Sequence, residues 1–315
     1  MAKKLKVVLT AILLLSWVRP AFSESTDTEK LDRIYQSFVD KFRQRNQQSE
    51  RLKLIDSSSR QMNEFLSEKV SKPAMKNLLP KLVPIRLLDL DDTFVTVIDN
   101  HPDKEVQALA LLCFAKYCGN NGRDEICKTS LAFLKKRYGK IRYDDDTTFG
   151  QAAEEAFYFL TTLSVGKEAP RIAGTDADGT LFRLPDYRGK VVMLRFWGDW
   201  CPACRAMFDY ERQLVKKHKN RPFALIGVNS DSLERLQTAQ KRANLTWRTI
   251  WDGGTTNGPI STIYRVKQWP KIVVIDANGV IRFRSEGLAK PQLDEILSRC
   301  IDEAEASRLN DLAKK

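Results

Sequence analysis

The chemistry of this sequence concentrates on Cys201 and Cys204, which form its single C-x-x-C motif. The motif directly follows an apolar, β-rich run at 190–197, and Pro202 favours the first turn of a helix, where its missing N–H is not needed. A thiolate at a helix N-terminus meets unpaired backbone N–H groups, which lower its pKa below the ordinary value of about 8.5. We therefore predict that Cys201 is the exposed nucleophile and that Cys204, one turn further on, is the resolving thiol. A static disulfide or two buried thiols are the alternative.

The residues available for metal binding are few. The chain has two histidines, His101 and His218, and no second C-x-x-C, so a zinc site is disfavoured. Arg205 follows Cys204, which excludes the C-x-x-C-H motif of covalent haem attachment. We expect no metal and no cofactor other than the redox-active Cys201–Cys204 disulfide.

Residues 24–165 have the pattern of an all-helical domain, with apolar residues at three- and four-residue steps. The clearest feature is a helical hairpin whose two helices end at Gly119 and Gly139. Cys118 ends the first of these helices and Cys127 begins the second, which suggests a structural disulfide, with small buried thiols as the alternative. No catalytic cluster is visible here, so this domain is interpreted as a scaffold or a partner-binding region.

From Gly166 onward the pattern changes to alternating strands and helices. This order predicts an α/β fold with a mixed central sheet flanked by helices, preceded by the all-α domain. Strands are expected at 190–197, 223–229, 248–250, 271–276 and 280–285, and helices at 202–219, at 232–243 and from 291.

Five segments of the second half of the chain form a recognisable set: Gly166–Pro170, Asp176–Gly179, Leu184–Lys190, Trp200–Cys204 and Trp269–Pro270. With these segments, residues 166–302 resemble the thioredoxin-like thiol–disulfide oxidoreductases of the TlpA/ResA/DsbE type. The resemblance implies a thioredoxin-like fold in which Pro270 is a cis-proline packed against the active-site disulfide. It also implies that Trp200, Pro202, Trp269 and Pro270 contact the substrate, with the Trp269 backbone offered to a client cysteine.

The sequence departs from the usual pattern of such proteins near the cysteines. Met207 stands where an acidic residue is frequent, Arg195 replaces the buried acid of thioredoxins, and Ala203 replaces a frequent proline. These changes leave the activity class in place and bear on the redox potential. Arg195 could lower the pKa of the active-site thiols. Alternatively, a carboxylate such as Asp209 or Glu211 neutralises it, or it turns to solvent.

Residues 1–23 are predicted to be a signal peptide. A basic start is followed by the apolar segment 7–18 and by a small-x-small cleavage site at Ala21–Ser23. As a helix, that apolar segment would span about 18 Å, short of the roughly 30 Å membrane core. We expect a periplasmic or other extracytoplasmic protein without stable membrane insertion, and an uncleaved anchor is the alternative. Residues 303–315 are assigned to a polar C-terminal tail.

The formal net charge of +12 includes four basic residues of this signal segment. The remaining basic residues are scattered, with neither the stripe nor the motif that nucleic-acid binding requires. The sequence thus predicts an exported protein disulfide oxidoreductase whose partners are disulfide-bearing clients and an upstream thiol donor. One alternative is a peroxiredoxin-like thiol peroxidase, although Leu194 and Gly198 stand where that chemistry needs Pro and Thr or Ser. Another is a helical scaffold protein with a non-essential dithiol.

Overall fold

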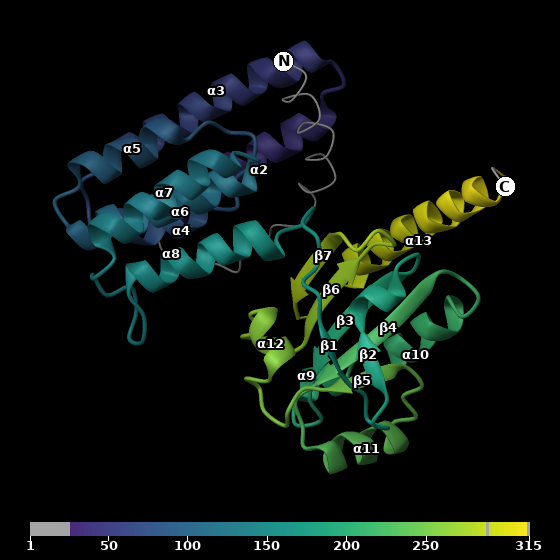
Figure 1. Ribbon diagram of the computed structural model, residues 1–315. Coiled ribbons are helices and arrows are strands. Elements are labelled where there is room, and N and C mark those ends of the chain that lie inside the picture. Colours follow the sequence, from purple (N-terminus) through teal and green to yellow (C-terminus); the bar gives the residue numbers. More distant parts are fainter. Residues whose placement is uncertain (1–25, 288–289, 314–315) are drawn as a thin grey trace. The chain divides into compact units, whose positions relative to one another are not determined.

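The computed structural model describes residues 26–287 and 290–313 (Figure 1). The chain forms two compact units, Met1–Leu160 and Thr161–Lys315. The boundary falls within a short π-helix, η1 (Phe159–Leu163). The predicted signal peptide lies outside the described residues.

The first unit is helical, as predicted. Its longer helices are amphipathic, and their apolar faces meet in one core that surrounds the largely buried α6. Helix ends follow local sequence: Asp103 caps α6, and Thr148 and Gln151 form a reciprocal capping box at the start of α8. The helices are α2 (Thr26–Gln44), α3 (Gln48–Ser67), α4 (Met75–Leu82), α5 (Asp91–Asn100), α6 (Lys104–Asn120), α7 (Asp124–Tyr138) and α8 (Phe149–Tyr158).

Helices α6 and α7 form the predicted hairpin, but the disulfide suggested within it is not formed. Cys118 and Cys127 are free, buried thiols, as are Cys113 and, in the second unit, Cys300. The hairpin turns Gly119 toward Cys127, since a Cβ added at Gly119 would lie 3.4 Å from the Cys127 Sγ. These cysteines therefore serve as small apolar side chains in the core.

The second unit contains a five-stranded mixed sheet in the order β5-β4-β3-β6-β7. The first three of these strands run parallel, and β6 and β7 pair antiparallel beside β3. A separate two-stranded hairpin, β1–β2, precedes the sheet. The strands are β1 (Ala173–Thr175), β2 (Leu181–Arg183), β3 (Val191–Trp197), β4 (Phe223–Asn229), β5 (Arg248–Trp251), β6 (Lys271–Ile275) and β7 (Ile281–Glu286).

The central strand β3 is buried along its whole length because both faces of the sheet are covered. Val191, Met193 and Trp197 on one face share a core with α10 (Phe208–Lys217), α11 (Leu233–Arg242) and α13 (Lys290–Ala313). On the other face, Phe196 packs on Tyr264, which directly follows α12 (Pro259–Ile263). The expected fold class, a mixed sheet with helices on both faces, is confirmed.

Two helices differ from the prediction. The segment expected as one helix over 202–219 is split into α9 (Pro202–Arg205) and α10, with a turn at Ala206 and Met207. The last helix continues to Ala313 through the segment assigned to a tail, because Ala304 packs into the core and Arg221 pairs with Asp302 and Glu305. None of the helices in the described ranges is long and apolar enough to cross a membrane.

Candidate active site

The predicted redox pair lies where β3 leads into α9. Cys201 is the extended N-cap residue of α9, and the backbone N–H of Cys204 donates to its Sγ at 3.1 Å. The two side chains are joined in a disulfide with their Cα atoms 5.2 Å apart. Cys204 has no exposed surface and Cys201 retains 4%. The geometry gives Cys201 the position at the helix N-terminus and shields Cys204. Cys201 is buried as well in this disulfide, so the exposed sulfur expected from the sequence is not observed, and the roles of the two thiols stay predictions.

Among the four residues expected to contact a substrate, the two tryptophans meet beside this turn. Trp200 is 41% exposed and its ring meets that of Trp269 edge-on, with centroids 5.7 Å apart. The Trp269–Pro270 peptide bond is cis, as the resemblance implies. Pro202 occupies the first position of α9 and is exposed, whereas Pro270 is buried. The two tryptophans thus form an aromatic rim beside the cysteines.

A network of aspartates that sequence reasoning missed holds the loop before Cys201. The backbone N–H of Asp199 donates to the Asp231 carboxylate at 2.6 Å, and Asn229 donates to the same oxygen at 2.9 Å. Trp197 and Asn229 are register partners in parallel strands, so the residues just beyond them meet at one edge of the sheet. An acidic residue placed shortly after each strand is the signal that could have identified this network.

Arg195 forms a buried ion pair with Glu211 beneath the active-site turn. Both side chains are fully buried, and the Arg195 guanidinium also donates to the backbone carbonyl of Cys204. Of the three fates considered from the sequence, neutralisation by a carboxylate is the one observed, and the solvent-facing alternative is wrong. Asp209, the other carboxylate considered, instead pairs with Arg212.

The division of the predicted helix into α9 and α10 places the Glu211 side chain beside the buried Arg195. Met207 occupies the turn and is fully buried, and the Glu211 backbone N–H donates to its carbonyl at 2.9 Å. Burial raises the pKa of Glu211 to about 7, against the opposing attraction of Arg195. A carboxyl group that changes protonation near neutral pH therefore lies under the segment that carries Cys204.

Nothing in the described ranges indicates a metal centre, because no group of three or more His, Cys, Asp or Glu side chains gathers there. The chemistry that this arrangement can perform is thiol–disulfide exchange. One thiol at a helix N-terminus, a shielded second thiol one turn away, and a neighbouring cis-proline on a mixed sheet define a thioredoxin-like oxidoreductase.

Comparisons with known proteins agree with this class. Residues 165–284 match the AhpC/TSA family. The thiol-disulfide oxidoreductase ResA of Bacillus thuringiensis subsp. konkukian is 32% identical over 139 residues, which are 44% of this chain and 79% of that protein. ResA of Geobacillus kaustophilus is 32% identical over 123 residues, 39% of this chain and 69% of the relative. The chain belongs to the ResA family of thiol–disulfide oxidoreductases.

Among solved structures, a DsbE-like thiol:disulfide interchange protein from Chlorobium tepidum is 26% identical, with a TM-score of 0.41. The matched region covers 44% of this chain and 99% of the Chlorobium tepidum chain. The AhpC/TSA match begins at residue 165, so the helical unit lies outside it.

Proposed function

We propose that this protein is exported and exchanges its Cys201–Cys204 dithiol with disulfides of client proteins. The observation that carries the proposal is the placement of the two sulfurs, with Cys201 at the N-cap of α9, where a backbone N–H faces its Sγ, and Cys204 fully buried within that helix. The AhpC/TSA match and the ResA relatives support the class of reaction.

The reaction proceeds in two exchanges. The Cys201 thiolate attacks one sulfur of a client disulfide, so a mixed disulfide forms and the other client sulfur leaves as a thiolate. Cys204 then loses its proton and attacks the Cys201 sulfur, which releases the second client thiolate. The client gains two electrons and two protons, and the protein becomes oxidised. An upstream dithiol restores the reduced state, and we propose no cofactor beyond the active-site disulfide.

Trapping the mixed disulfide tests this function. Cys204→Ser retains the attacking thiol and lacks the resolving one, so it should accumulate client proteins attached through Cys201, visible on non-reducing gels and identified by mass spectrometry. Cys300→Ser is the matched control, because Cys300 is a buried free thiol of the same unit. Equal trapping by Cys201→Ser/Cys204→Ser would contradict the proposal.

A thiol peroxidase is the second candidate, because residues 165–284 match the AhpC/TSA family. Leu194 and Gly198 occupy the positions where peroxidase chemistry needs Pro and Thr or Ser, so no hydroxyl there assists the attack of Cys201 on a peroxide. Consumption of hydrogen peroxide by the reduced protein, compared with reduction of hydroxyethyl disulfide, separates the two functions. Faster turnover of the peroxide would replace the proposed function.

Export rests on the sequence of residues 1–23. An extracytoplasmic location would allow disulfide exchange with exported clients. N-terminal sequencing of the protein from its native host should begin at Glu24. A sequence that begins within the first ten residues would favour an uncleaved anchor.

A further inference from the structure

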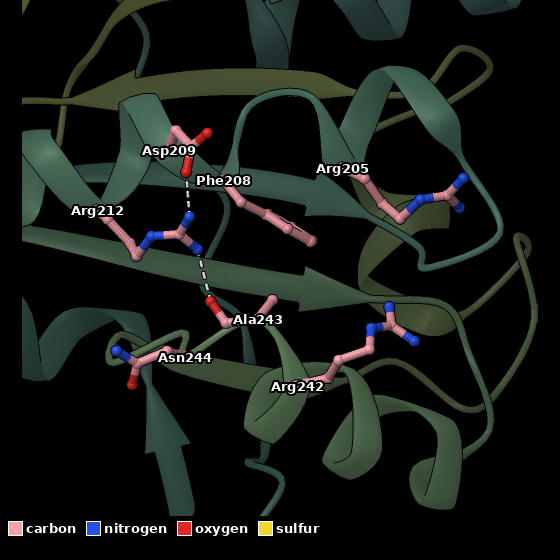
Figure 2. A pocket seen from close by; sticks show the side chains of 7 residues that line it. All are labelled: Arg205, Phe208, Asp209, Arg212, Arg242, Ala243 and Asn244. Atoms are coloured by element: carbon pink, nitrogen blue, oxygen red, sulfur yellow. Dashed lines mark hydrogen bonds and ion pairs between the residues drawn. The ribbon is translucent and has the colours of Figure 1, made fainter.

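A pocket that begins at Arg205, the residue after Cys204, has three arginines among its seven lining residues. Its volume is about 570 Å³, within the range of a binding site that holds one or two side chains. The lining residues come from α9, α10 and the end of α11: Arg205, Phe208, Asp209, Arg212, Arg242, Ala243 and Asn244. We call this surface the arginine pocket. Figure 2 shows Arg205 and Arg242 at one end, the Arg212–Asp209 pair at the other, and Phe208 between them.

The pocket is directly connected to the active-site segment. Arg205 follows Cys204 in the chain, and its guanidinium donates to the backbone carbonyl of Asp199, two residues before Cys201. Phe208 is 6% exposed and its ring packs edge-on against Trp197 at the end of β3, with centroids 5.4 Å apart. Arg205 and Phe208 therefore join the pocket to the segment that carries both cysteines.

The charges of the pocket favour a carboxylate. The two aspartates near it are already paired, Asp209 with Arg212 and Asp199 with Arg242. Asp199 is shared with Arg235 as well, at 3.5 Å. Arg205, whose described partner is a carbonyl oxygen, brings a positive charge that no carboxylate in the described part of the chain offsets with an ion pair. An incoming carboxylate would supply that missing charge.

The side chains also have the right form for this ligand. A guanidinium carries five N–H donors, and the hydrogen bond from Arg205 to Asp199 uses one nitrogen, which leaves the other donors for a planar acceptor. The Arg242 side chain is 56% exposed although it is paired, so a ligand can reach it. Phe208 and Ala243 give the pocket an apolar part for the methylene groups of Asp or Glu.

We propose that the arginine pocket binds an acidic side chain of the client, located a few residues from the cysteine that reacts with Cys201. The inference rests on the proposed function and specifies its substrates: disulfide-bearing segments that carry Asp or Glu near the reactive cysteine. The client tethered at Cys201 raises the local concentration of its own carboxylate, so a partly exposed arginine site suffices for selection.

Matched peptides test this proposal. Three disulfide-bonded peptides differ only in the residues that flank the reactive cysteine: Asp and Glu, Asn and Gln, or Lys. The rate constant kcat/KM for their reduction by the dithiol protein should be about three- to tenfold higher for the acidic peptide than for the neutral one, and lowest for the basic one. The preference should decline between low and high ionic strength, because exposed charges are screened by salt.

Substitutions of the pocket arginines test whether the pocket causes the preference for acidic peptides. Arg205→Gln and Arg242→Gln should each reduce the ratio of acidic to neutral rates, and the double variant should bring it close to one. Arg205→Lys keeps the charge and should restore part of the ratio, which a purely structural role would not require. Lys219→Gln removes an exposed charge that does not line the pocket, and it should leave the ratio unchanged.

The possible outcomes separate this proposal from the one on which it rests. If the wild-type protein reduces hydroxyethyl disulfide but treats acidic and neutral peptides alike, the pocket proposal is wrong and the proposed function stands. A preference for acidic peptides that persists in the Arg205→Gln/Arg242→Gln variant would also overturn it. If the protein reduces neither the peptides nor hydroxyethyl disulfide, the proposed function is wrong, and the pocket proposal that rests on it is wrong as well.

Discussion

The redox pair of the second unit and the three cysteines of the helical unit differ in the surroundings of their sulfur atoms. Cys300 of the second unit is a buried free thiol like those of the helical unit. In the helical unit, Cys113 and Cys118 lie within α6, where burial raises the pKa of each thiol to about 12. Burial raises the pKa of Cys127 to about 11. In the second unit, Cys201 lies at a helix N-terminus and accepts a hydrogen bond from a backbone N–H. Burial is the dominant influence on the helical unit's thiols, even at Cys127, where a backbone hydrogen bond with Gly119 lowers the pKa in part, whereas Cys201 combines a backbone donor with a helix N-terminus.

The comparison predicts first which cysteines are needed for exchange. Cys201→Ala should lower kcat/KM for a model disulfide by at least about a thousandfold, because the attacking sulfur is lost. The combined replacement Cys113→Ala/Cys118→Ala/Cys127→Ala should leave it within about twofold. Insulin reduction by both variants, after a check of folding by circular dichroism, measures this. A large loss of exchange in the folded triple variant would break the comparison.

The rate of alkylation in the reduced protein should also differ between the buried cysteines of the helical unit and Cys201. At neutral pH a thiol with a pKa of about 12 is almost entirely protonated, so Cys113 should react with iodoacetamide at least about a hundred times more slowly than Cys201. Mass spectrometry of timed samples locates the label, and unfolding in guanidinium chloride should remove the difference. Labelling of Cys204 before Cys201 would reverse the roles assigned to the pair.

The buried pair under the active site predicts a pH-dependent stability. Because the pKa of Glu211 is raised to about 7 in the fold from an ordinary 4.5, the unfolded chain ionises first as pH rises. Relative to Glu211→Gln, the wild-type free energy of unfolding should fall between about pH 4.5 and 7, by roughly 1–3 kcal/mol. Denaturant titrations at several pH values measure it. Asp209→Asn, an exposed acid of the same helix, is the control, and a pH-independent difference would refute the assignment.

The smallest effect is expected for the arginine of that pair. Its guanidinium faces Glu211 and the Cys204 carbonyl, so its charge is largely offset before it reaches the Cys201 sulfur. Arg195→Met should raise the pKa of Cys201 by less than about one unit, even though it destabilises the fold. Thiolate absorbance against pH measures the titration. A rise of two units or more would make Arg195 a direct determinant of thiol reactivity.

Sequence patterns were most informative where one local signal determined the outcome. The continuous apolar run of β3, the Asn278-Gly279 turn before β7, and the cysteines at the start of α9 could all be read from consecutive residues. For Arg195 the sequence offered Asp209 and Glu211 as partners but could not choose between them, because the choice depends on the interruption of the helix at Met207. Three-dimensional neighbours such as Asp199 and Asp231 depend on strand register, which a single sequence specifies weakly.

The C-terminal helix has a consequence for when this unit can fold. Leu293, Leu297 and Ile301 of α13 belong to the same core as β3, about a hundred residues earlier in the chain. Arg221, two residues before β4, forms ion pairs with Asp302 and Glu305 in the second half of that helix. The core around the central strand is therefore completed only when α13 packs against it, after β3 itself has been synthesised. A nascent chain that lacks the α13 segment carries both active-site cysteines without the complete core that surrounds them in the folded unit.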